Sequence, residues 1–143
     1  MTVRKILNLK GSDVVTIAPE KKLLEAIAIL TKHQIGALIV TGKNKEVAGV
    51  LSERDIVRLL SNKDANRFEN SVASAMTTDV KSVGPDDTIQ HVMQVMTMGR
   101  FRHMPVVQNG KLVGVISIGD VVKLRLEEME RESEHLKEYI ATA

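Results

Sequence analysis

Residues 49–55 read Gly-Val-Leu-Ser-Glu-Arg-Asp, and residues 114–120 read Gly-Val-Ile-Ser-Ile-Gly-Asp. In both stretches an apolar run ends at a serine, and an aspartate follows three residues later. Serine and an acidic residue at this spacing are typical of the start of a helix, where each side chain accepts a hydrogen bond from the other residue's backbone N–H. We therefore interpret Ser52 and Ser117 as helix N-caps, each close to a capping box with Asp55 or Asp120.

The sequence upstream of each motif repeats as well. Apolar runs on either side of a polar turn predict one β-hairpin from strands 37–41 and 47–51, and another from strands 104–107 and 112–116. Each hairpin is preceded by apolar residues at the i, i+3, i+4, i+7 spacing of an amphipathic helix. These residues are Leu23, Ala26, Ile27 and Leu30 in the first unit, and Ile89, Val92, Met93 and Met96 in the second.

A short β-type run opens each unit, at residues 14–17 and 80–83, and a proline follows it. Pro19 and Pro85 are expected in the first helical turn, where a missing N–H has no consequence. Each unit is thus predicted as β-α-β-β-α, and the fold class as α/β of the α+β type. Units of about 60 residues bury too little surface to be stable alone, so we expect the two to pack with pseudo-twofold symmetry and with clefts between them.

The expected boundaries are 3–60 for the first repeat, 61–71 for a polar linker, 72–125 for the second repeat and 126–143 for a C-terminal helix. Residues 3–7 match residues 72–76. In the tail, apolar residues and Ser133 follow one another at spacings of 4, 3, 4, 3 and 4, which is typical of a coiled-coil seam. The sequence leaves open whether this helix lies across its own domain or pairs with a second subunit.

Composition excludes several classes of function. Hydrophobic residues make up 43% and charged residues 27% of the chain, as in a globular protein with a core. The absence of cysteine excludes disulfides, thiolate zinc sites and a cysteine nucleophile. Because aromatics are 2% and the net charge is +2, nucleic acid is not an expected partner. No apolar run is long enough for a membrane span and no signal peptide is evident, so a soluble, cytoplasmic protein is predicted.

The repeated motifs resemble those of the CBS (cystathionine β-synthase) domain pair, also called a Bateman module. The resemblance rests on the two seven-residue motifs and on residues 72–77 and 102–107, and it covers about residues 3 to 125. It implies a free-standing, non-catalytic regulatory module that needs no cofactor and binds an adenosine nucleotide, such as AMP, ADP, ATP or NAD(H), between the repeats. It also implies a homodimer that signals energy or redox state to an unidentified partner protein.

In that family each cleft combines the serine and aspartate of one repeat with a strand of the other, so the resemblance implies two unequal sites. The first would combine Ser52, Arg54, Asp55, Thr78, Val80, Arg102, His103, Met104 and Pro105. The second would combine Ser117, Gly119, Asp120, Val14, Thr16, Gly36, Ala37 and Leu38. Because the second set lacks basic residues, an anionic nucleotide is expected to bind more strongly at the first, with Arg58, Arg100 and Lys123 adding charge at the rim.

The roles implied by the resemblance have simpler alternatives. Asp55 and Asp120 are expected to accept hydrogen bonds from ribose hydroxyls, but each could serve only as a helix cap. Arg54 and His103 are expected near phosphate, with a solvated surface charge as the alternative for Arg54. An enzyme that uses Asp55, His103 and Arg54 as acid–base groups is disfavoured, because no nucleophile with a base and an orienting group is visible. A dimeric scaffold with vestigial clefts is the main alternative function.

Overall fold

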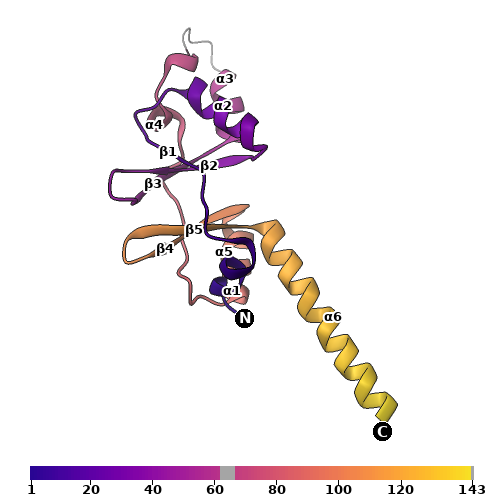
Figure 1. Ribbon diagram of the computed structural model, residues 1–143. Coiled ribbons are helices and arrows are strands. Elements are labelled where there is room, and N and C mark those ends of the chain that lie inside the picture. The colour runs from indigo at the N-terminus through magenta and orange to yellow at the C-terminus, as the bar shows by residue number, and fades with distance from the viewer. Residues whose placement is uncertain (62–66, 143) are drawn as a thin grey trace.

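The computed structural model describes residues 1–61 and 67–142. The first unit contains β1 (Thr16–Ile17), α2 (Leu23–His33), β2 (Ala37–Thr41), β3 (Val47–Ser52) and α3 (Glu53–Leu60). The second contains α5 (Ile89–Gly99), β4 (His103–Gln108), β5 (Lys111–Ser117) and α6 (Ile118–Thr142). The remaining elements are α1 (Val3–Lys10), η1 (Arg67–Glu69) and α4 (Val72–Ala75). The predicted mixed α/β fold is confirmed, and Figure 1 shows the strands of both units lying between two sets of helices.

The two sheets differ in size. The first has the order β1-β2-β3, with β1 parallel to β2, and the second is the β4-β5 hairpin. The strand predicted at 80–83 is wrong except at its last residue, because Val83 forms only an isolated parallel bridge to Val106. Val80 N donates to Thr78 O at 3.0 Å, so the backbone before Val83 turns instead of following β4.

Pro19 and Pro85 do not lie in the first turn of a helix, so that expectation is wrong. Each is the second residue of a tight turn, closed by a hydrogen bond of 3.2 Å from Lys21 N to Ala18 O in one unit and from Asp87 N to Gly84 O in the other. Proline is favoured at this position because its fixed φ suits the turn. The helices α2 and α5 begin four residues after the prolines.

The two units exchange their first helices. Val3 and Ile6 of α1 are buried in the core of the second unit, together with Val106 and Ile116. Val72 at the start of α4 is instead buried in the core of the first unit. Because each core contains a helix from the other half of the sequence, the chain crosses between the units before β1 and again after α4.

The motif glycines make room for these crossing segments. A Cβ atom on Gly49 would lie 2.7 Å from Thr77 O and 2.8 Å from the Met76 sulfur. A Cβ atom on Gly114 would lie 2.5 Å from Leu7 Cδ2. At the first glycine the backbone itself is paired, since Val50 and Thr77 exchange two hydrogen bonds of 3.0 and 2.8 Å. Glycine in the motif therefore allows the segment from the other repeat to lie directly on the strand.

The C-terminal helix α6 begins at Ile118, directly after β5, and runs without interruption to Thr142. Val121 and Leu124 on its first turns are buried in the second unit, whereas its last turns project away from both units (Figure 1). The expected boundary at residue 126 thus falls inside one continuous helix. In the part of the chain that the structure describes, no helix combines the length and apolar composition that a membrane span requires.

Candidate functional site

Both predicted capping boxes are present. Asp55 N donates to Ser52 Oγ at 3.2 Å, and Ser52 N donates to Asp55 Oδ2 at 2.9 Å. In the second repeat, Asp120 N donates to Ser117 Oγ at 3.1 Å, and Ser117 N donates to Asp120 Oδ2 at 2.9 Å. The helix-capping interpretation of both aspartates is therefore confirmed, and any ligand contact would be an additional role.

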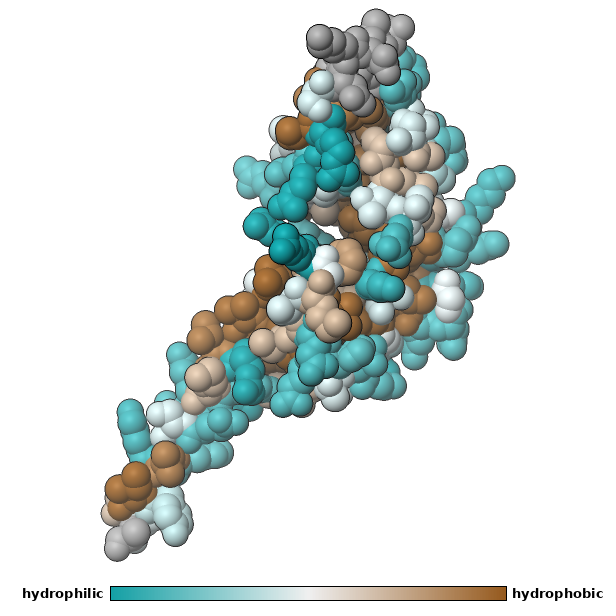
Figure 2. Space-filling view, turned by 180° about the vertical axis from the view of Figure 1, so that it is seen from behind, coloured by the Kyte–Doolittle hydropathy of each residue, from teal (hydrophilic) through white to brown (hydrophobic). Residues whose placement is uncertain are grey.

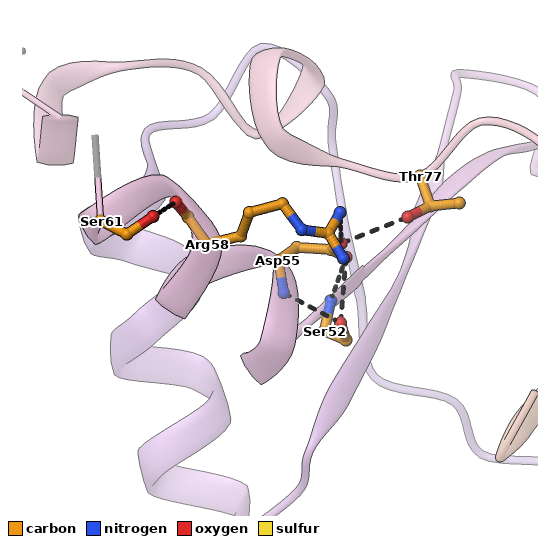
Figure 3. Close-up of polar contacts among 5 residues, drawn as sticks. All are labelled: Ser52, Asp55, Arg58, Ser61 and Thr77. Atoms are coloured by element: carbon orange, nitrogen blue, oxygen red, sulfur yellow. Dashed lines mark hydrogen bonds and ion pairs between the residues drawn. The ribbon is translucent and has the colours of Figure 1, made fainter.

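The two oxygens of Asp55 have different surroundings (Figure 3). Oδ2 is committed to the cap, since it accepts from both Ser52 N and Ser52 Oγ, the latter at 3.0 Å. Oδ1 has weaker partners, Thr77 Oγ1 at 3.3 Å and Arg58 Nη1 at 3.7 Å. Asp55 is only 8% exposed. Among the side chains that the structure describes, it is the only charged one that is buried. Its Oδ1 atom keeps acceptor capacity for a ligand hydroxyl.

A hollow of about 410 Å³ opens beside Asp55 and is lined by both units. This volume lies in the range of small-molecule sites. Its lining is electropositive, with five cationic residues against three acidic ones: Arg54, Arg58, Lys81, Arg100 and Arg102 against Glu53, Asp55 and Asp79. Val50, Val80 and Phe101 add an apolar part. An anion with an apolar ring would match this mixture.

Strand register explains which residues meet at the hollow. Ala37 in β2 lies opposite Ser52 in β3, and Glu53 N donates to Gly36 O at 2.9 Å. The structure thus places Gly36 and Ala37 in the first hollow, not in the second site to which the family pattern assigned them. His103 in β4 lies opposite Ser117. Both strand ends reach the hollow, so its wall comes from both repeats.

His103 is half-buried at the edge of this hollow. Burial lowers the pKa of His103 below its ordinary value, and the nearby charges of Lys10 and Arg102 lower it further, while Asp120 opposes them. This shift favours the neutral imidazole, which can donate one hydrogen bond but carries no charge. Positive charge at this end of the hollow comes from Arg102.

The second motif is arranged differently, because Lys10 at the end of α1 forms an ion pair with its aspartate, Asp120. Lys10 Nζ lies 2.7 Å from Asp120 Oδ2 and 3.1 Å from Val115 O. Burial on its own raises the pKa of Asp120, but the hydrogen bonds from Lys10 and Ser117 and the charge of Lys10 bring it below its ordinary value. The charge of Asp120 is thus already compensated within the chain.

Not every expected site residue lines a hollow. Leu38, Met104 and Pro105 are fully buried and belong to the packing of the units. Thr78 is exposed, and its neighbour Thr77 takes the place beside Asp55. Val14 and Thr16 line a separate hollow of about 230 Å³ with Lys45 and Leu112, which contains neither Ser117 nor Asp120. The second site therefore stays a prediction.

Some lining residues were not expected from the sequence: Thr77, Val50, Glu53, Asp79 and Lys81. Val50 and Glu53 lie inside the first motif, and the other three flank Thr78 or Val80, so proximity in sequence was the available signal. A larger hollow of about 660 Å³ lies beside β1 and α2, but it is lined by the first unit alone and includes no residue of either motif. The residues that the structure describes include no group of three His, Asp or Glu side chains that could hold a metal ion.

Comparison with known proteins identifies the repeats. The family model of the CBS domain matches residues 3–62 and 72–127. The crystal structure of a CBS-domain-containing protein from Agrobacterium tumefaciens is 44% identical and superposes with a TM-score of 0.81, covering 87% of this chain and 99% of that chain. The mitochondrial CBS domain-containing protein CBSX3 of Arabidopsis thaliana is 30% identical over 147 residues, which span 97% of this chain and 71% of that protein.

Two more distant structures contain adenosine ligands. CBSX2 in complex with AMP is 22% identical with a TM-score of 0.77, covering 88% of this chain and 97% of that chain. The CBS domain pair of protein MJ0100, in complex with 5′-methylthioadenosine and S-adenosyl-L-methionine, is 24% identical with a TM-score of 0.78, covering 90% and 98%. At these identities the likeness establishes the fold that the chains share.

Proposed function

Because this chain belongs to the CBS-domain family, we propose that it is a non-catalytic regulatory module that binds an adenosine nucleotide between its two repeats. AMP, ADP, ATP and NAD(H) are the candidate ligands, since each presents a ribose, an adenine ring and phosphate. CBS pairs of the same fold have been crystallised with AMP and with S-adenosylmethionine. Binding would report energy or redox state to a partner protein.

One observation carries this proposal: the acceptor atom Asp55 Oδ1 faces an electropositive hollow that both repeats line. The ribose hydroxyls would donate to Asp55 Oδ1, where Thr77 and Arg58 are only weakly engaged. The phosphate would lie toward Arg102 and the N-terminus of α3, where the helix dipole favours an anion. The adenine would lie against the apolar part of the lining.

The nucleotide would act through the arrangement of the two units. Gly36 and Ala37 belong to the first unit and Arg102 and His103 to the second, yet all four line the same hollow. A ligand that contacts both walls stabilises the arrangement in which both contacts are made, and it shifts the population only by that difference in affinity. The shift would then be transmitted to whatever protein binds the helices.

We also propose that the module works as a homodimer. Leu24 of α2 and Val57 of α3 are 55% and 64% exposed, although both are large apolar residues on the outer helices of the first unit. Such exposed apolar side chains are typical of surfaces that bind another protein. The alternative is a dimeric scaffold that responds to no nucleotide. The ion pair between Lys10 and Asp120 favours this alternative, but only for the second cleft.

The test is a thermal-shift panel on nucleotide-stripped protein with AMP, ADP, ATP, NAD, NADH and S-adenosylmethionine. A ligand at about 100 times its dissociation constant adds ~2.7 kcal/mol to the free energy of unfolding. For a chain of this size the melting temperature should rise by roughly 5–10 °C. A rise with one ligand class identifies the signal, whereas no rise with any of them would favour the scaffold.

A further inference from the structure

The projecting part of α6 has an apolar stripe against which no other described part of the chain packs. Every residue from 129 to 142 is exposed. Leu126, Met129, Leu136 and Ile140 are between 53% and 65% exposed, and Figure 2 shows brown side chains along one side of the projecting helix. A helix with an apolar stripe is normally stabilised by burying that stripe. The first alternative left open by the sequence, a helix lying across its own domain, therefore does not apply to this stretch.

The stripe has the period of a coiled coil. Its members occupy alternating a and d positions of a heptad repeat, with Val122, Met129 and Leu136 at d and Leu126, Ser133 and Ile140 at a. A seam of this period lets two helices pack knobs into holes along their whole contact, and a single polar residue at an a position restricts the register. Ser133 is that residue here.

We propose that this surface binds the same surface of a second copy of the chain, as a parallel, in-register, two-stranded coiled coil. The charged residues that flank the seam favour a second copy as the partner and a parallel direction. The e positions are Lys123, Glu130 and Lys137, and the g positions are Arg125, Glu132 and Tyr139. In a parallel pair each g residue faces the next e residue of the second copy, so Arg125 meets Glu130 and Glu132 meets Lys137. Because the dimer has twofold symmetry, each of these attractive pairs occurs twice.

The antiparallel arrangement is opposed by the same charges. The seam can also be aligned antiparallel about Arg131, which pairs Leu126 with Leu136 and Met129 with Ser133. In that arrangement e faces e and g faces g. Lys123 would then face Lys137, Glu130 would face its own copy, and Glu132 would face its own copy. Like charges at these positions disfavour the antiparallel pair.

This inference deepens the dimer part of the proposed function, because it adds a contact surface on α6 to the one at Leu24 and Val57 and gives the direction of the pair. Both nucleotide-binding bodies would lie at the same end of the coil, since α6 leaves each body in the same sense. The inference does not depend on any nucleotide, so the two proposals can fail separately.

The direct test is disulfide cross-linking of the full chain, which has no natural cysteine. Ser133→Cys places two thiols in the same layer of a parallel, in-register coil, and mild oxidation without nucleotide should give a cross-linked dimer. Glu134→Cys is the matched control, because residue 134 follows residue 133 directly but lies on the outer side of the coil. Equal cross-linking of both variants would overturn the proposal. So would a preferred disulfide between Met129→Cys and Ser133→Cys chains in a mixture, which the antiparallel coil predicts.

A charge series tests the direction independently by sedimentation equilibrium. Lys137→Glu turns an attractive pair into a repulsive one in the parallel coil, so the dimer dissociation constant should rise roughly 3- to 10-fold. The antiparallel coil predicts a lower constant, because Lys137 there faces Lys123. Lys137→Glu combined with Glu132→Lys should restore the parental value. Arg125 is not used, because it also pairs with Glu128 on its own helix at 3.1 Å.

The two proposals give distinguishable outcomes. If the chain is dimeric but Ser133→Cys gives no cross-link, the proposed homodimer stands and the coiled coil is overturned. A cross-linked dimer that shows no thermal shift with any nucleotide would keep the coiled coil and favour the scaffold. A chain that is monomeric at all concentrations would overturn the coiled coil and the homodimer together.

Discussion

Lys10 and Asp120 form an ion pair between the end of α1 and the second capping box, with Nζ 2.7 Å from Oδ2. Asp55, which holds the equivalent place in the first repeat, has Arg58 Nη1 3.7 Å from its Oδ1 atom. The two aspartates of the repeated motif are therefore not equivalent: one is closely matched by an ammonium group from its own chain, and the other faces a hollow.

Lys10→Ala should release Asp120 as a second acceptor for a ribose. The pair is partly exposed, so its loss should lower the free energy of unfolding by less than about 1 kcal/mol. In titration calorimetry with AMP, the number of nucleotides bound per chain should rise from one toward two. Lys22→Ala is the matched control, because it removes the exposed pair with Glu69 at 2.8 Å. An unchanged stoichiometry in Lys10→Ala would show that this lysine does not close the second site.

Asp55→Ala should weaken AMP binding roughly 10- to 100-fold, because a hydrogen bond to a charged group typically contributes about 1.5–3 kcal/mol. It should also lower the free energy of unfolding by about 1 kcal/mol through loss of the cap. Asp120→Ala removes the same kind of cap from α6 and separates the two effects, since it should destabilise the protein without weakening AMP. Equal AMP affinity in the two variants would mean that Asp55 is only a cap.

His103 should make the protein less stable as the pH falls from 7 toward 5. Its pKa is lowered in the folded state, so the unfolded chain takes up a proton first, near the ordinary value of about 6.5. The stabilisation is complete above that pH and is lost as the pH falls toward the folded pKa. Urea denaturation at pH 7.5, 6.5 and 5.5 should show a smaller pH dependence in His103→Gln than in the parent. Exposed His91→Gln should behave like the parent, and a parental slope in His103→Gln would contradict the assignment.

Gly49→Ala should destabilise the protein by about 1–3 kcal/mol, since the added Cβ would meet the backbone oxygen of Thr77 at 2.7 Å. The shift of Thr77 should also weaken nucleotide binding, because Thr77 Oγ1 is a partner of Asp55 Oδ1. Gly84→Ala is the control, since its nearest neighbour would be 3.8 Å from the new Cβ. Thermal denaturation of the two variants with and without AMP checks both effects.

The sequence predicted those parts of the fold that depend on neighbouring residues. The hairpins, α2 and the caps at Ser52 and Ser117 each follow from a periodicity or a spacing within one short stretch. The exchange of first helices was not predictable, because Val3 and Val72 occupy matching positions and are equally suited to either core. Their placement depends on the path of the chain between the units.

The candidate site was predicted in part for the same reason. Ser52, Arg54, Asp55, Arg102 and His103 belong to motifs and line one hollow. Lys10 was missed because its partner Asp120 is 110 positions away, and no local pattern links them. Gly36 and Ala37 were assigned to the other cleft because the family pattern combines the motif of one repeat with a strand of the other. In this structure β2 pairs with β3, so the start of β2 also lies at the hollow beside its own repeat's motif.

The exchange of first helices also bears on how such a chain could have arisen by gene duplication. Val3 and Ile6 fill the core of the unit to which they do not belong in sequence, and Val72 does the reverse. A protein with a single repeat could not place its own first helix in its own core by this path. It would have to give that helix to a second molecule and receive one in return. Two repeats in one polypeptide convert this intermolecular swap into an intramolecular one.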